Sequence, residues 1–150
     1  MKLKLMLSVL FMSSLSVFAQ PSSLNTQDFA KTVSSGKVQV LDVRTADEYK
    51  SGHLDKALQA NWLDANEFYD RTSHLDKNIP VYIYCLSGGR SGAAAEALRA
   101  KGFKVTNMEG GINAWKKNNL PLVGNNANVK QTTMTAYQGQ IRRTNIVLVD

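Results

Sequence analysis

The segment from Val81 to Ser91 constrains the fold of this chain more than any other part of its sequence. It begins with four β-favouring residues and continues into a short loop that contains two glycines and an arginine. The run that follows, Gly92 to Arg99, is typical of a helix. A strand that passes through a tight loop into a helix is how α/β proteins build an anion site. The loop amides and the helix N-terminus then direct partial positive charge at one point.

The only cysteine of the chain, Cys85, stands at the start of this loop. We expect its thiol to have a depressed pKa and its thiolate to be exposed at the head of the helix, because the local field favours the charged form. Gly88 and Gly89 allow backbone N–H groups to turn inward, and Arg90 can grip an oxyanion through two N–H donors. The alternative is a buried structural cysteine, which is the common state of a free cysteine.

Predicted strands and helices alternate along the chain, which favours an α/β fold with a parallel sheet and helices on both faces. Capping signals at Asn25, Thr45 and Asp64 start three of the helices. Phe68 and Tyr69 are expected to face inward from the third of these helices. The predicted strands are residues 38–43, 57–60, 81–84 and 104–108, and the predicted helices begin near residues 26, 46, 65, 92 and 112.

Residues 1–19 have the pattern of a secretory signal peptide, with Lys2 and Lys4 before an apolar stretch and an expected cleavage site before Gln20. We therefore expect an exported, periplasmic protein with no membrane attachment after cleavage. A retained N-terminal anchor is the alternative. A single cysteine in an exported protein forms no internal disulfide, so the free thiol needs another explanation.

Loss of residues 1–19 lowers the formal net charge from +6 to +4, because the segment contains two lysines and no acidic residue. This mild excess is spread along the chain. It fits a small anionic ligand better than nucleic acid, for which the sequence shows no basic stripe or aromatic platform.

Three motifs in order resemble the signatures of the rhodanese family of sulfurtransferases. The resemblance covers residues 24–122. It implies one rhodanese domain over residues 20–122, with a five-stranded parallel sheet flanked by helices. The motifs are Leu41-Asp42-Val43-Arg44 with Glu48-Tyr49, Gly52-His53-Leu54 and Ala57; the loop from Cys85 to Arg90; and Glu109-Gly110-Gly111-Ile112 with Trp115.

The resemblance implies a double displacement at Cys85, with no cofactor and no metal. The thiolate would attack the outer sulfur of thiosulfate or a similar small anionic donor and become a persulfide, and cyanide or a thiol would accept that sulfur. Inward N–H groups of the loop would bind the persulfide. The residues expected to bind substrate or persulfide are Leu86, Ser87, Gly88, Gly89 and Arg90.

Other residues of these motifs receive structural roles. In the family Asp42 and Arg44 mainly brace the active loop, and His53 belongs to a structural turn. The chain departs from family members tuned to thiosulfate, in which basic residues can occur at the positions of Leu86 and Ser87. This departure weakens the case for thiosulfate in particular.

Two other functions compete with sulfur transfer. Phosphatases and arsenate reductases on the same scaffold place five residues between cysteine and arginine. Only four stand between Cys85 and Arg90, which suits a sulfur atom better than a phosphate. A non-catalytic binding or sulfur-carrier module is the second competitor, and the presence of both residues argues against it.

The C-terminal residues 123–150 are interpreted as a linker and tail. Ile146 to Asp150 resembles the strand that leads into the active site of thioredoxin-like proteins, so the chain is hypothesised to be the front part, or a truncated descendant, of a fusion. An extra edge strand or a disordered tail is the alternative. Under the fusion hypothesis a thioredoxin-like dithiol protein is the natural sulfur acceptor.

Overall fold

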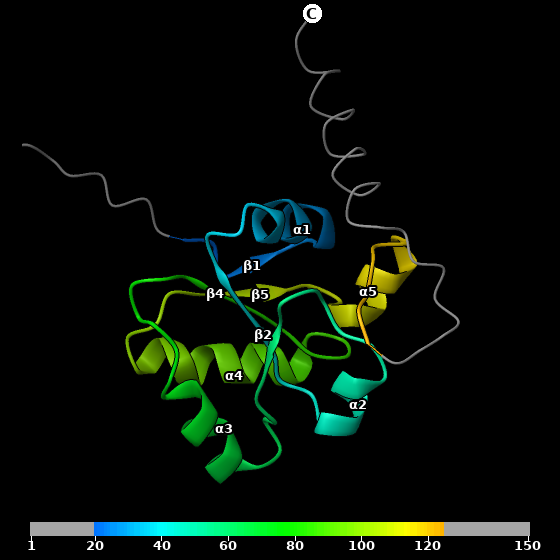
Figure 1. Ribbon diagram of the computed structural model, residues 1–150. Helices are drawn as coiled ribbons and strands as arrows, with labels where there is room; N and C mark the ends of the chain where they lie inside the picture. Colours follow the sequence, from blue (N-terminus) through cyan, green and yellow to red (C-terminus); the bar gives the residue numbers. More distant parts are fainter. Residues whose placement is uncertain (1–19, 125–150) are drawn as a thin grey trace, which may run out of the picture.

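Five parallel strands form the middle layer of residues 20–124, the part of the chain that the computed structural model describes (Figure 1). The strand order is β1-β5-β4-β2-β3. The α/β class and the five-stranded parallel sheet expected from the sequence are confirmed. In chain order the elements are β1 (Ser23–Leu24), α1 (Thr26–Ser34), β2 (Gln39–Asp42), α2 (Ala46–Lys50), β3 (Leu58–Gln59), α3 (Ala65–Thr72), β4 (Val81–Tyr84), α4 (Gly89–Ala100), β5 (Val105–Met108) and α5 (Gly111–Lys117).

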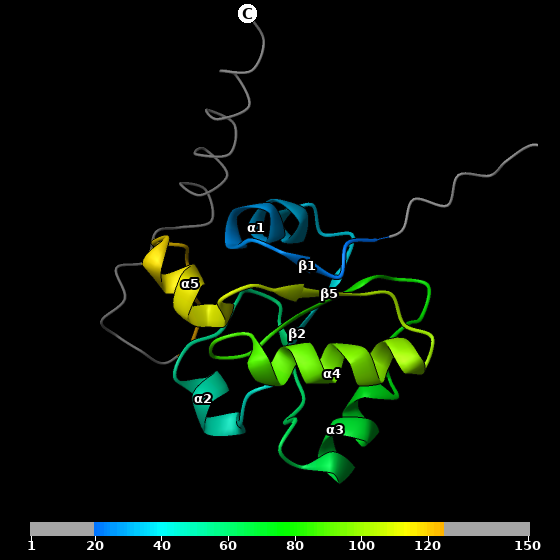
Figure 2. The same cartoon turned by 180° about the vertical axis from the view of Figure 1, so that it is seen from behind.

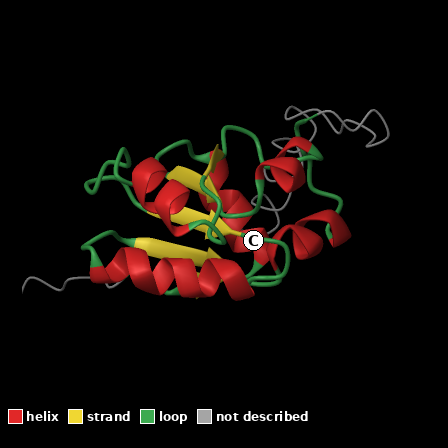
Figure 3. Cartoon of the chain, turned by 90° about the horizontal axis from the view of Figure 1, so that it is seen from below, coloured by secondary structure: helices red, strands yellow, loops and turns green. Residues whose placement is uncertain are grey.

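Helices cover both faces of the sheet (Figure 3). Helices α1 and α5 lie on one side, and α3 and α4 lie on the other (Figure 1). Figure 2 shows α1 above the sheet and α4 below it from behind. Strand β4 lies in the centre, and all four of its residues are buried. A strand covered on both faces reads as a continuous apolar run, which is the pattern that the sequence shows before Cys85.

The capping signals act as expected. Asn25 accepts hydrogen bonds from two backbone N–H groups at the start of α1, and Asp64 accepts one from α3. Thr45 forms a capping box with Glu48 at the start of α2. These side chains satisfy N–H groups that have no partner inside the helix, so local sequence sets where the helices begin.

Two expectations about elements need correction. Tyr69 does not face inward: its side chain is 39% exposed, whereas the neighbouring Phe68 is fully buried. Successive residues on a helix point about 100° apart, so both cannot face the same core. The ammonium of Lys101 lies 3.7 Å from the centre of the Tyr69 ring instead. Helix α4 also begins three residues earlier than predicted, at Gly89.

Strand β1 was not predicted from the sequence. Ser23 and Leu24 pair in parallel with Asn107 and Met108 of β5, and they complete the sheet at one edge. Two residues are too short to show strand periodicity, so only the pairing reveals this element.

The predicted signal peptide at residues 1–19 and the predicted tail beyond Gly124 lie outside the described residues. The chain returns to the domain before that point, because Val123 pairs with His53 through two backbone hydrogen bonds of 2.8 Å. Within residues 20–124, no helix is long and apolar enough to cross a membrane.

Candidate active site

Cys85 follows the last residue of β4, at the carboxyl end of the central strand. Its sulfur accepts a hydrogen bond from the backbone N–H of Gly88 at 3.1 Å and one from the Ser91 hydroxyl at 3.4 Å. The residue is only 1% exposed, so the expectation of an exposed thiolate was wrong. The next two residues of the loop, Leu86 and Ser87, are exposed.

The pKa of the Cys85 thiol lies below its usual value. Burial raises this pKa, because it disfavours a charged thiolate. Hydrogen bonds from the Ser91 side chain and from the backbone N–H groups of Ser91, Ser87 and Gly88 lower it by more. The thiol is therefore buried but held among donors that favour its anion, which is how reactive cysteines differ from structural ones.

Ser91 is a site residue that the sequence analysis did not assign. It is fully buried in the first turn of α4, and its hydroxyl also lies 3.2 Å from the carbonyl oxygen of Gly88. The hydroxyl has one proton, so it donates either to this carbonyl or to the Cys85 sulfur. Its place directly after Arg90, at the predicted helix start, was the available signal.

The two loop glycines differ in backbone conformation. Gly88 has a φ of +102°, in the left-handed region that side chains rarely adopt. Its N–H thereby turns toward the Cys85 sulfur. A Cβ atom on Gly89 would meet nothing within 4 Å, and its φ is not positive. Gly88 therefore gives the loop the turn that directs an N–H group at the sulfur, whereas Gly89 is the first residue of α4.

Helix α5 holds the loop from outside. The N–H of Ile112 donates to the carbonyl oxygen of Cys85 at 2.9 Å, and the N–H of Asn113 donates to that of Leu86 at 3.1 Å. A Cβ atom on Gly111 would lie 2.5 Å from the Cys85 oxygen, so only glycine allows this approach. Each of these carbonyls shares a peptide plane with the next N–H group, so α5 helps to fix the direction of the loop amides. The Gly110-Gly111-Ile112 motif thus supports the loop, which sequence reasoning did not foresee.

The guanidinium of Arg90 is not an unpaired cation at the site. Its Nη1 and Nη2 atoms donate to the two carboxylate oxygens of Glu48 at 2.9 Å and 2.7 Å. The hydrogen bonds from Arg90 lower the pKa of Glu48 to about 2, and those from Thr45 contribute. The pKa of Arg90 is raised, first by Glu48 and also by the neighbouring Cys85 thiol. Arg90 therefore lies at the site as predicted, but as half of an ion pair.

Asp42 and Arg44 form a buried ion pair next to the central strand. The Arg44 Nε donates to both oxygens of Asp42 at 2.9 Å and 3.0 Å, and its Nη2 donates to the carbonyl oxygen of Gly52 at 2.8 Å. The guanidinium carbon lies 5.7 Å from the centre of the Tyr84 ring, whose hydroxyl accepts the N–H of Leu54. The pair ties the turn after α2 to the sheet. These contacts do not include a residue of the Cys85 loop, so the expectation that the pair braces this loop stays a prediction.

His53 also has structural contacts. Its Nδ1 atom lies 2.9 Å from the carbonyl oxygen of Tyr49, and its ring stacks on that of Tyr49 at 3.6 Å between centres. Among residues 20–124, no group of three or more histidine, cysteine, aspartate or glutamate residues is arranged to hold a metal ion.

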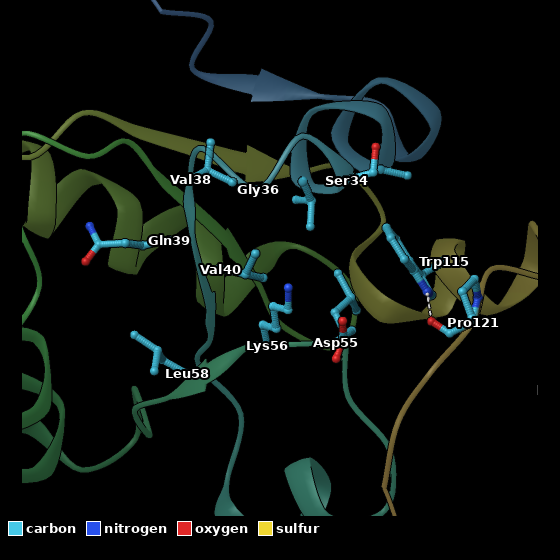
Figure 4. Close-up of a pocket in the computed structure, with 13 residues that line it drawn as sticks. Ser34, Gly36, Val38, Gln39, Val40, Asp55, Lys56, Leu58, Trp115 and Pro121 are labelled. Carbon is cyan, nitrogen blue, oxygen red and sulfur yellow. Dashed lines mark hydrogen bonds between the residues drawn. The ribbon is translucent and has the colours of Figure 1, made fainter. Parts of the chain in front are cut away.

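An apolar groove of about 340 Å³ opens on the face of the sheet that carries α1 and α5 (Figure 4). Trp115 closes one side of it and donates its ring N–H to the carbonyl oxygen of Pro121 at 2.9 Å. No residue of the Cys85 loop lines this groove, so it is separate from the candidate site. Its apolar lining residues include Val33, Val38, Val40, Leu54 and Leu58.

Comparisons with known proteins agree with this geometry. The Rhodanese-like domain family matches residues 25–118. A protein named sulfurtransferase from Allochromatium vinosum is 39% identical over 87 residues, which cover 57% of this chain and 78% of that protein. The thiosulfate sulfurtransferase GlpE of Coxiella burnetii is 34% identical over 80 residues, 53% of this chain and 72% of that protein.

The chain spans less of some other relatives. The uncharacterized protein YqhL of Bacillus subtilis is 35% identical over 80 residues, which cover 53% of this chain and 61% of YqhL. The crystal structure of a rhodanese-related protein from Thermoplasma volcanium superposes with a TM-score of 0.61 at 28% sequence identity. That alignment covers 67% of this chain and 96% of the other.

Proposed function

The chain belongs to the Rhodanese-like domain family, and from this premise we propose that it is a sulfurtransferase that carries sulfane sulfur on Cys85. Sulfur transfer in general is supported by relatives named sulfurtransferase. The donor and the acceptor are the finer part of the proposal: thiosulfate or a related donor gives up its outer sulfur, and cyanide or a thiol accepts it.

The observation that supports the proposal most directly is the environment of the Cys85 sulfur. Gly88 and Ser91 donate to it, and the pKa of the thiol is lowered despite burial. A nucleophilic cysteine needs such a site, because the thiolate is the attacking species.

The first step forms a persulfide. The Cys85 thiolate attacks the outer sulfur of the donor and forms a new S–S bond, while the bond between that sulfur and the rest of the donor breaks. With thiosulfate, the leaving group is sulfite, which departs with the electron pair of the broken bond. The negative charge moves from the thiolate to the terminal sulfur of the persulfide. The N–H groups of Ser87 and Gly88 donate to the Cys85 sulfur, and we expect inward N–H groups of this loop to stabilise the charge of the persulfide as well.

The second step regenerates the thiolate. Cyanide or a thiolate attacks the terminal sulfur of the persulfide, the S–S bond to Cys85 breaks, and the sulfur leaves as thiocyanate or as a new persulfide. A thioredoxin-like dithiol protein in the periplasm is the macromolecular acceptor that we propose.

The test replaces Cys85 with serine in the full chain. Intact mass should show a gain of one sulfur atom on the wild type after thiosulfate treatment, and thiocyanate should form when cyanide is added. Both signals should vanish in Cys85→Ser because a hydroxyl is not ionised near neutral pH. His74→Ala, a change at an exposed histidine, is the control and should retain both.

The competing functions give other results. A non-catalytic binding or sulfur-carrier module predicts no formation of thiocyanate by the wild type, whether or not its mass increases. A phosphatase predicts Cys85-dependent hydrolysis of p-nitrophenyl phosphate without sulfur uptake. Either result would overturn the sulfurtransferase proposal.

A further inference from the structure

The guanidinium of Arg90 is neutralised by a carboxylate from a different element. Both of its terminal nitrogens donate to Glu48 of α2, at 2.9 Å and 2.7 Å, in a bidentate geometry. The two side chains are 23% and 30% exposed, so water screens the pair only in part. A donor that approaches Cys85 therefore meets an ion pair rather than a free cation.

Glu48 is anchored in this position. Its Oε2 atom accepts the backbone N–H of Thr45 at 3.0 Å and the Thr45 hydroxyl at 3.1 Å, which is half of the capping box that starts α2. The same oxygen accepts from Arg90. Because three donors hold the carboxylate, moving it aside to free Arg90 would also expose the start of the helix.

The rest of the loop offers no replacement cation. Leu86 and Ser87 are uncharged, and the nearby Arg44 is paired with Asp42. Apart from the partial positive charge of the loop amides, the formal charges at this site are those of the Cys85 thiolate, Arg90 and Glu48, which sum to a single negative charge. Repulsion from a net negative site grows with each negative charge that a donor carries.

We propose that Glu48 determines donor specificity: by neutralising Arg90 it makes the site select sulfane-sulfur donors of low negative charge, such as organic persulfides and thiosulfonates, over dianionic thiosulfate. This inference rests on the proposed sulfur transfer at Cys85. Glu48 acts through Arg90, so it is a positioning and charge-setting residue and not a catalytic one.

Two donors that differ by one charge isolate this effect. Thiosulfate is a dianion, and methanethiosulfonate has a methyl group in place of one of its charged oxygens. In both, the Cys85 thiolate attacks the outer sulfur and one S–S bond breaks. The leaving group, sulfite or methanesulfinate, departs with the electron pair. The intrinsic difference in reactivity cancels when the ratio of the two kcat/KM values is compared between variants.

Two variants complete the design, and each removes one negative charge from α2 at a different position. Glu48→Gln removes the charge beside Arg90, and glutamine is accepted at the same position of a capping box. Asp47→Asn removes one charge from the neighbouring position of α2. The Asp47 side chain is 95% exposed and pairs with Lys50.

We expect Glu48→Gln to raise the ratio of kcat/KM for thiosulfate to that for methanethiosulfonate by about tenfold at low ionic strength, chiefly through KM. The rise should shrink toward 1 M salt, where the Debye length is about 3 Å. Asp47→Asn should leave the ratio within about twofold, the range of a screened surface charge. An unchanged ratio in Glu48→Gln, or an equal loss with both donors, would overturn the inference.

Alkylation of Cys85 tests the charge argument without sulfur transfer. Iodoacetate is an anion and iodoacetamide is neutral, and they have similar size. Glu48→Gln should raise the rate ratio of iodoacetate to iodoacetamide, whereas Asp47→Asn should not. If the wild type gains no sulfur from either donor, the proposed function fails. The alkylation ratio then still decides whether Glu48 sets the charge at Cys85, because a ratio that Glu48→Gln leaves unchanged overturns that role.

Discussion

At the scale of single residues, the protonation state of the Cys85 thiol depends on a balance between burial and hydrogen bonding. Burial disfavours its thiolate, and donors from the loop and the first turn of α4 favour it. The Ser91 hydroxyl is a neutral side-chain donor among them, at 3.4 Å from the sulfur. This contact can be removed without touching the backbone of the loop.

We predict that Ser91→Ala raises the pKa of the Cys85 thiol by roughly one unit, because a hydrogen bond to a charged group contributes about 1.5 kcal/mol. The rate of iodoacetamide alkylation rises with pH through the thiol pKa, so its midpoint should move to higher pH. Sulfur uptake near neutral pH should slow by a similar factor of about ten.

Ser87→Ala is the matched control for this change. Its side chain is exposed, and Ser87 contributes to the site through its backbone N–H, which alanine retains. The thiol pKa should move far less than in Ser91→Ala. Equal shifts in the two variants would show that the Ser91 hydroxyl has no particular role.

At the scale of elements, the approach of α5 to the Cys85 loop depends on Gly111. Its φ is +56°, and a Cβ atom there would lie 2.5 Å from the Cys85 oxygen and 2.7 Å from Leu86 backbone atoms. These contacts are with backbone, so they cannot be relieved by a rotation of a side chain.

Gly111→Ala should therefore push the loop away from α5 and cost about 3 kcal/mol of unfolding free energy, from overpacking together with left-handed strain. The thiol pKa should also rise, because the displaced amides lose their alignment with the sulfur. Urea unfolding and the pH dependence of alkylation measure the two effects.

Gly36→Ala separates strain from crowding. Gly36 has a φ of +71°, but a Cβ atom there would meet nothing within 4 Å. The variant should lose only about 1 kcal/mol of stability and leave the thiol pKa unchanged. A loss in Gly111→Ala no larger than this would contradict the assigned role of α5.

The elements also show which kinds of structure local sequence can reveal. Helix starts at Asn25, Thr45 and Asp64 were predicted correctly, since a capping residue acts on N–H groups within three positions of itself. Strand β1 was missed because its two residues are a strand only by pairing with β5. Tyr69 was misplaced because the sequence alone does not say which side of α3 meets the core.

At the scale of the whole molecule, the Asp42–Arg44 pair joins the sheet to the turn at Gly52. Asp42 is 0% exposed and Arg44 is 2% exposed. Removing one partner of such a pair leaves an uncompensated buried charge, which is costlier than removing both.

We predict that Arg44→Met lowers the unfolding free energy by about 3–5 kcal/mol. The double variant Asp42→Asn, Arg44→Met should recover part of this loss, because it leaves no unpaired carboxylate. Urea titration measures both. Sulfur uptake per folded molecule should stay near the wild-type value in each. A folded Arg44→Met that takes up no sulfur would contradict a purely structural role.

The strand before Cys85, the loop with its glycine and arginine, and the class of fold could all be inferred from neighbouring residues. Such features depend on propensity, periodicity and short-range hydrogen bonds, which local sequence encodes. The resemblance to a family then ordered these features into one domain.

The burial of the thiol, the support of the loop by α5 and the pairing of Arg90 with Glu48 could not be inferred in this way. Glu48 is 42 positions before Arg90, and Ile112 is 27 after Cys85. Contacts of this kind exist only after the parallel strands have brought distant segments to one edge of the sheet. The tertiary structure therefore determines the net charge of the groups near Cys85. The cysteine itself could be identified as a candidate site residue from its neighbours in the sequence.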